Sequence, residues 1–105
     1  MKILFDQGTP HPLRLHLFGH AVTTVYELGW NRLTNGNLIL TAEQEGFDLL
    51  VATDQNLKYQ QNLTRRKIAI VVLLTTSWPR LQKATRQIAA TVAAISTGDY
   101  VEVTA

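Results

Sequence analysis

Short apolar runs alternate along the chain with segments in which apolar residues recur at helical spacing. Such runs, when rich in β-branched residues, are typical of strands that are buried in a sheet. The clearest is Ile-Ala-Ile-Val-Val-Leu-Leu, whereas the last strand candidate alternates apolar and polar positions, as a strand at the edge of a sheet does. The predicted strands are 2–5, 20–28, 47–52, 68–74 and 100–103.

Helices with recognisable ends are predicted in three of the intervening segments, and a shorter one in the fourth. Thr9 fits an N-cap position ahead of a helix that contains Leu13 and Leu17 and ends at Gly19. A second helix is expected to begin near Thr34 or Asn35 and to end at Gly46. The third and longest is expected over 77–95, after a capping Ser77, and its many alanines would suit close packing or a homodimer contact. Residues 55–67 are polar and predict a short helix with turns.

This order of elements predicts the fold class. Strands that alternate with helices are typical of a parallel sheet with helices on both faces. We therefore expect an α/β protein, a Rossmann-like three-layer sandwich with a mostly parallel central sheet of four to five strands. A chain of 105 residues is expected to form one domain, 1–105.

Composition excludes several function classes. The chain has no cysteine, which rules out disulfides, thiolate metal sites and cysteine nucleophiles. The formal net charge of +2 is a weak field that permits a polyanionic partner without arguing for one. No apolar run approaches the ~18 residues of a membrane span, and the first residues do not resemble a signal peptide. We expect a soluble, cytoplasmic protein that does not associate with membranes.

Two carboxylates follow predicted strands directly, namely Asp6 after the first and Asp54 after the third. In open parallel sheets, ligands bind at the carboxyl ends of the strands, near the switch in strand order. Carboxylates placed there can hold Mg²⁺ or Mn²⁺, because these hard cations prefer oxygen ligands. The alternative is that each aspartate only caps the turn that follows it.

The chain resembles a known family over nearly its whole length. The residues that carry the resemblance are the opening Lys-Ile-Leu-Phe-Asp-Gln-Gly-Thr-Pro, the later Phe-Gly-His and Ala-Val-Thr-Thr-Val, and the strand that ends in Thr53-Asp54-Gln55-Asn56. In order and spacing they are similar to small PIN-like proteins of the toxin type. The resemblance implies a Rossmann-like fold with an acidic pocket that binds one or two divalent ions and cleaves single-stranded RNA. It also implies a small antitoxin protein as partner.

Carried over by position, Asp6 matches the first acid of the family and Asp54 the acid after the third strand. The other two acidic positions fall on Asn35 and Asn56. An amide carbonyl can coordinate a hard cation but brings no charge, so metal binding would be weaker. Glu27, at the end of the second predicted strand, could reach the same edge and act as a metal ligand.

Further polar residues near this edge are candidates for substrate binding. Some flank the two acids and could hydrogen-bond a water or a phosphate, and others could contact RNA through charge or stacking. As turn residues they need no function, and an aromatic side chain could equally pack under a loop. The candidates are Gln7, Thr53, Gln55, Arg32, Lys58 and Tyr59.

The sequence supports two main hypotheses. The first is a metal-dependent endoribonuclease of PIN-like type, the toxin of a toxin–antitoxin pair. The second is a non-catalytic PIN-like module that binds RNA or a protein partner, favoured by the two asparagines at acidic positions. A third, a nucleotide-binding domain, is disfavoured because no glycine-rich phosphate loop is present.

Overall fold

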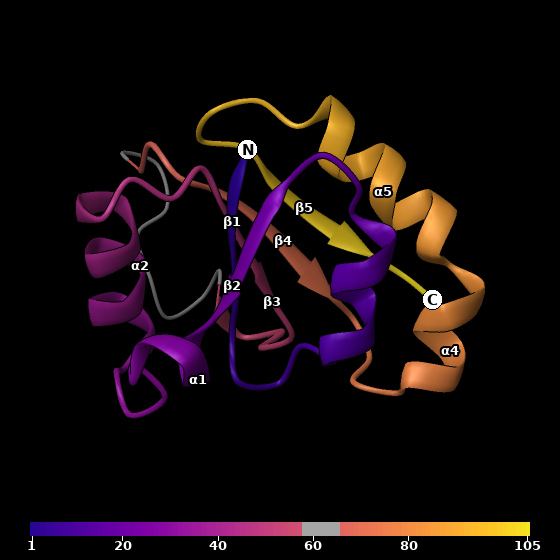
Figure 1. The fold of residues 1–105 in the computed structure, drawn as a ribbon, viewed down its shortest axis with the longest axis horizontal. Coiled ribbons are helices and arrows are strands. Elements are labelled where there is room, and N and C mark those ends of the chain that lie inside the picture. Colours follow the sequence, from indigo (N-terminus) through magenta and orange to yellow (C-terminus); the bar gives the residue numbers. More distant parts are fainter. Residues whose placement is uncertain (58–65) are drawn as a thin grey trace.

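Five parallel strands form a single sheet in the order β2-β1-β3-β4-β5, seen in a computed structural model that describes residues 1–57 and 66–105 (Figure 1). All neighbouring strands are parallel, which confirms the predicted α/β class. The sheet places the predicted edge strand at one end of this order. The strands are β1 (Lys2–Phe5), β2 (Ala21–Thr24), β3 (Leu49–Ala52), β4 (Ala69–Leu73) and β5 (Tyr100–Val103).

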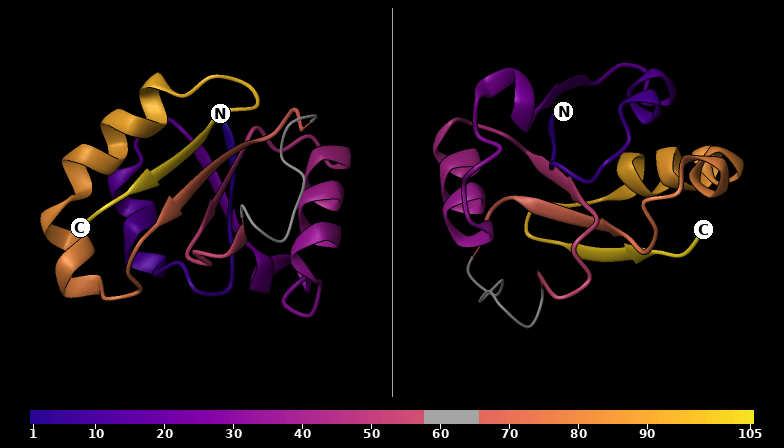
Figure 2. Two further views of the ribbon diagram at one scale, coloured as in Figure 1. Left: turned by 180° about the vertical axis from the view of Figure 1, so that it is seen from behind. Right: turned by 90° about the horizontal axis from the view of Figure 1, so that it is seen from below.

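Helices cover both faces of the sheet, which gives the three layers expected of a Rossmann-like sandwich (Figure 2). One face carries α1 (Val25–Leu28) and α2 (Asn35–Gln44). The other carries the 3₁₀ helix η1 (His11–His16) together with α4 (Trp78–Lys83) and α5 (Thr85–Ala94).

The alternation of side chains along each strand divides the core in two. In β1, Ile3 and Phe5 pack with the face that carries η1 and α5, whereas Leu4 packs with α2 on the opposite face. Every residue of β3 and β4 is buried, as expected of central strands in a parallel sheet. This packing fixes the ends of the strands and hence the loops that follow them.

The second strand is shorter than predicted. It ends at Thr24, where the chain enters α1 instead of continuing to Leu28. The Thr24 hydroxyl accepts from the backbone N–H of Glu27 (3.2 Å), and the Glu27 carboxylate accepts from the backbone N–H of Thr24 (3.0 Å). This reciprocal capping box starts a helix inside a stretch that otherwise favours a strand.

Two helix predictions are also corrected. The first helix is a 3₁₀ helix that begins after Pro10, not after Thr9, and the Thr9 hydroxyl bonds elsewhere. The long helix expected over 77–95 is broken at Ala84 into α4 and α5. There, the hydroxyl of Thr85 donates to the carbonyl of Gln82 (3.4 Å), a local bond of the kind that competes with helical pairing.

The helix and turns predicted over 55–67 fall mostly on residues outside the described part of the chain, as do the candidate residues Lys58 and Tyr59. Among the helices that the structure does describe, none is long and apolar enough to cross a membrane.

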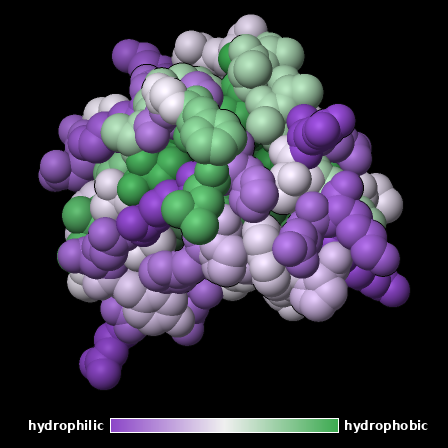
Figure 3. Space-filling model, turned by 45° about the vertical axis from the view of Figure 1, so that its right-hand side comes forward, coloured by the Kyte–Doolittle hydropathy of each residue, from purple (hydrophilic) through white to green (hydrophobic). Residues whose placement is uncertain are grey.

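Two large apolar side chains stand out on the surface of η1 and the turn that follows it. Leu15 is 72% exposed and Phe18 is 85% exposed. Figure 3 turns the η1 and α5 side of the molecule forward and shows hydrophobic groups gathered on it between hydrophilic ones. The predicted homodimer and antitoxin contacts stay predictions.

Candidate functional site

The two aspartates lie on either side of the point where the strand order reverses. The chain runs from β1 to β2 on one side and then returns to place β3 on the other side of β1. Loops that leave the two strands in opposite directions open a crevice there, which is where doubly wound sheets bind ligands. Asp6 follows β1 and Asp54 follows β3, so both belong to this carboxyl edge of the sheet.

Asp6 is half-buried and held by hydrogen bonds on both carboxylate oxygens. Its Oδ1 accepts from the backbone N–H of Gly8 (3.1 Å) and lies 2.7 Å from the Thr9 hydroxyl, and its Oδ2 accepts from the backbone N–H of Thr53 (3.2 Å). The Thr9 hydroxyl also lies 2.9 Å from the Val51 carbonyl oxygen, and its single proton serves one of these acceptors at a time. Asp6 therefore caps the turn that follows β1 and also lies at the candidate site.

Burial raises the pKa of the Asp6 carboxyl above its ordinary value, while hydrogen bonds from Thr9, Thr53 and Gly8 act in the opposite direction. The charged carboxylate is thus costly in this position. A cation or a donor from a ligand would reduce that cost.

Gly8 is required by a close approach between the loops after β1 and β3. A Cβ atom at this position would lie 2.1 Å from the Oγ1 of Thr53. The absence of a side chain therefore lets the two loops meet beside Asp6.

Asp54 is joined to the start of α2. Its Oδ2 accepts from the Nδ2 of Asn35 (2.7 Å), and its Oδ1 accepts from the backbone N–H of Asn56 (2.9 Å). Asn35 is placed by the helix start, where the Thr34 hydroxyl accepts from the backbone N–H of Asn37 (3.4 Å). The structure thus brings together Asp6, Asp54 and Asn35, three of the four positions that resemble the acids of PIN-like proteins. At the fourth position, Asn56 contacts Asp54 through its backbone N–H.

Glu27 is engaged in other contacts. Its carboxylate accepts from the Thr24 backbone and forms an ion pair with Arg14. The hydrogen bond from Arg14, and then that from the Thr24 backbone, lower the pKa of this exposed carboxyl. Across the described ranges, no three Asp, Glu or His side chains are grouped so as to hold a metal ion. Glu27 therefore serves the start of α1, apart from the two aspartates.

A small cavity of about 70 Å³ opens beside Asp6. Gln7, one of the predicted substrate-binding residues, lies in its wall together with Trp30 and Asn31 from the loop after α1. Trp30 is half-buried, and its ring meets that of Phe47 edge-on, with centroids 6.0 Å apart. Arg32 is exposed in the same loop. The full lining is Asp6, Gln7, Val25, Trp30, Asn31, Leu33, Asn35 and Leu38.

The other predicted substrate-binding residues support the loops. Thr53 uses its backbone N–H to hold Asp6, and Gln55 donates from Nε2 to the carbonyl of Leu74 (3.0 Å) at the end of β4. The hydroxyl of Thr75 in the next loop accepts from the backbone N–H of Ser77 (3.1 Å). Sequence reasoning overlooked the Thr75 hydroxyl, although the same strand-end rule would have found it.

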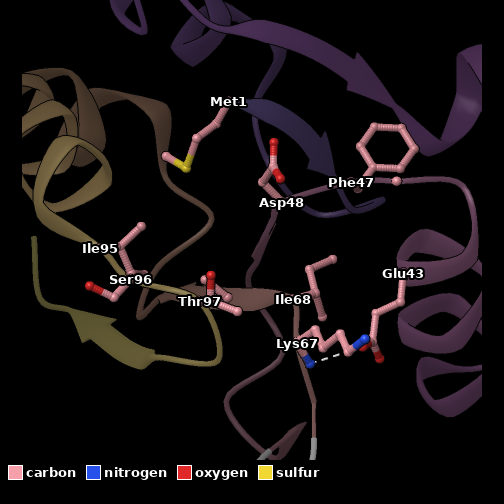
Figure 4. Close-up of a pocket in the computed structure, with 11 residues that line it drawn as sticks. Met1, Glu43, Phe47, Asp48, Lys67, Ile68, Ile95, Ser96 and Thr97 are labelled. Carbon is pink, nitrogen blue, oxygen red and sulfur yellow. Dashed lines mark hydrogen bonds between the residues drawn. The ribbon is translucent and has the colours of Figure 1, made fainter.

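A larger cavity, about 580 Å³, lies at the opposite edge of the sheet, where the strands begin (Figure 4). In its wall, the Glu43 carboxylate accepts from the backbone N–H of Lys67 (2.9 Å), and Asp48 accepts from the backbone N–H of Lys2 (2.8 Å). Sequence reasoning made no prediction for this edge. Its lining comprises Met1, Glu43, Gly46, Phe47, Asp48, Lys67, Ile68, Ala69, Ile95, Ser96 and Thr97.

Comparison with known proteins does not extend this description. No protein-family model matches the chain, and neither a search of curated proteins nor a search of solved structures finds a similar one. The residues at the carboxyl edge are therefore what points to a function.

Proposed function

We propose that the carboxyl edge of the sheet is the active site of a PIN-like metal-dependent endoribonuclease, the toxin of a toxin–antitoxin pair. The observation that carries this proposal is the position of Asp6 and Asp54 on the two sides of the switch in strand order. Paired carboxylates at this point are suited to holding a divalent ion next to an RNA phosphate.

The donor set fits Mg²⁺ or Mn²⁺ held by few protein ligands. From the described residues, Asp6 Oδ2 and both oxygens of Asp54 each accept one hydrogen bond, so each has a further lone pair with which to bind a cation. Mg²⁺ is commonly held by one or two carboxylates, with waters and substrate phosphates completing its shell. When bound here, such an ion would supply a Lewis acid and an activated water for phosphodiester hydrolysis.

The chain's own residues would position the reaction. Gly8, Thr9 and Thr53 hold the Asp6 carboxylate in one orientation, and Asn35 holds that of Asp54. Gln7 and Arg32 lie on the exposed rim, where they would contact the RNA strand. Roles for Lys58 and Tyr59 in RNA contact belong to the same proposal.

A second candidate function is favoured by the Asn35 side chain. Its neutral amide donates to Asp54, so this carboxylate has a partner without any cation. A carboxylate at that position would instead repel Asp54, and a metal ion or a proton between the two would relieve the repulsion. The second candidate is therefore a non-catalytic PIN-like module that binds RNA or a protein partner.

The deciding experiment is incubation of the protein with fluorescent single-stranded RNA in Mn²⁺, in Mg²⁺ and in EDTA. The test variant is Asp6→Asn/Asp54→Asn, and the matched control is Asp99→Asn, an exposed aspartate just before β5. We expect cleavage that needs the metal, disappears in the double variant and persists in the control. Cleavage in EDTA or in the double variant would contradict the proposal. A folded, inactive protein without metal-dependent stabilisation would support the second candidate.

A further inference from the structure

Among the described residues, carboxamides outnumber charged groups around the candidate site. The loops at the carboxyl edge of the sheet, together with the first residue of α2, hold five amide side chains, two carboxylates and the guanidinium of Arg32. The amides belong to Gln7, Asn31, Asn35, Gln55 and Asn56.

The cavity beside Asp6 collects three of these amides. Gln7 and Asn31 are exposed, and their side chains make no hydrogen bond within the described part of the chain. They lie beside Trp30, which Phe47 holds in place. Among the described residues that line this cavity there is no lysine or arginine. The cavity is therefore a hydrogen-bonding recess next to an aromatic ring and the Asp6 carboxyl, without a described cationic side chain that would attract a phosphate.

These groups match the edge of a nucleobase. A carboxamide offers one acceptor and two donors in a plane, and glutamine and asparagine use them to bind base edges in pairs of hydrogen bonds. Proteins that recognise single-stranded RNA combine such contacts with aromatic side chains. The cavity of about 70 Å³ has room for about two waters, so it admits the edge of a base and leaves the rest outside.

We infer that the carboxyl edge selects its RNA by base identity, with Gln7 and Asn31 bonding the edge of an unpaired base beside Trp30. This inference rests on the proposed function for its placement of RNA at the site. It specifies the substrate class as single-stranded RNA with a preferred base, bound mainly through hydrogen bonds rather than through phosphate charge.

The test measures the binding of fluorescent 12-nucleotide homopolymers of U, A and C by anisotropy, with EDTA present so that no RNA is cleaved. Gln7→Ala and Asn31→Ala are compared with Gln44→Ala, an exposed amide at the end of α2, and with Arg32→Ala. We expect the wild type to prefer one homopolymer, and each test variant to lose about five- to tenfold in affinity for it alone. Arg32→Ala should weaken all three equally and flatten the salt dependence.

The outcomes separate this inference from the proposed function. Equal binding of all three homopolymers, or an equal loss for all of them in the amide variants, would overturn the inference even if the protein cleaves RNA. Selective, amide-dependent binding without any metal-dependent cleavage would support the inference and overturn the nuclease. Absence of both binding and cleavage would overturn both.

Discussion

The side-chain amide of Asn35 donates to the carboxylate of Asp54 over 2.7 Å and so joins the first residue of α2 to the loop after β3. The contact is the central fact about this site. The neutral amide of Asn35 donates at a position where a second acidic side chain would repel Asp54. A cation would relieve that repulsion. Whether the site needs a metal therefore depends on the contact between Asn35 and Asp54.

Converting the amide to an acid should couple stability to metal. Asn35→Asp would place two carboxylates at the same contact, so we expect the free energy of unfolding to fall by about 1–3 kcal/mol in EDTA. Mn²⁺ should then raise the melting temperature of the variant more than that of the wild type. Thermal unfolding with and without Mn²⁺ measures both effects. Asn37→Asp, an exposed position on the same helix turn, is the control, and an equal Mn²⁺ response in both variants would contradict the reasoning.

Gly8→Ala should destabilise the protein through the loop after β3. The new Cβ would collide with Thr53 Oγ1, and such overpacking costs typically about 1–3 kcal/mol. The double variant Gly8→Ala/Thr53→Ala removes the colliding atom, so its loss should be smaller than the sum of the single losses. Urea unfolding of all four proteins of the cycle measures this coupling, and strictly additive losses would rule out the contact.

The two perturbed carboxyls should give opposite pH dependences. Asp6 has a raised pKa, so the folded state holds its proton more tightly than the unfolded state does. Its contribution to stability is full below the ordinary value of 3.8 and is lost as the pH rises through the raised pKa. Glu27 has a lowered pKa, so its contribution is present above 4.5 and is lost as the pH falls through the lowered pKa.

Urea unfolding at a series of pH values, for wild type, Asp6→Asn and Glu27→Gln, checks these signs. The stability of the wild type relative to Asp6→Asn should decline as the pH rises from below 3.8. The stability of the wild type relative to Glu27→Gln should increase as the pH rises through the acidic range. If both stability differences changed in the same direction with rising pH, the environment assigned to Asp6 or to Glu27 would be wrong.

Thr24 should matter for the boundary between β2 and α1. Thr24→Ala removes the hydroxyl that caps the helix, which typically costs about 1 kcal/mol of stability. Thr24→Ser retains the cap and should recover most of this loss. Chemical denaturation compares the three proteins, and equal losses in both variants would assign the effect to packing of the buried methyl group instead.

The strands were predictable because burial on both faces demands continuous apolar runs, as in β3 and β4. Departures from the prediction come from local hydrogen bonds that compete with such patterns. The Thr24–Glu27 capping box has a sequence signature, but the β-branched residues around it favour a strand more strongly. The break at Ala84 has no such signature, since nothing in an alanine predicts the end of a helix.

The candidate site could be predicted only in part, for a similar reason. Asp6 and Asp54 follow from the rule that ligands bind where parallel strands end. The engagement of Glu27 with Arg14 depends on how the packed chain brings a side chain of η1 to one of α1, although the two helices cover opposite faces of the sheet. The walls of both cavities likewise combine residues from loops that are distant in sequence, so spacing alone could not identify them.

The all-parallel sheet gives the molecule two different edges, which is useful for attaching it to a surface. Every strand enters at one edge and leaves at the other, so Met1 lies at the edge opposite Asp6 and Asp54. A linker attached ahead of Met1 would hold the molecule on a sensor surface with its candidate site turned toward the solution. Immobilisation through the first residue is therefore the orientation in which captured RNA would meet the least obstruction.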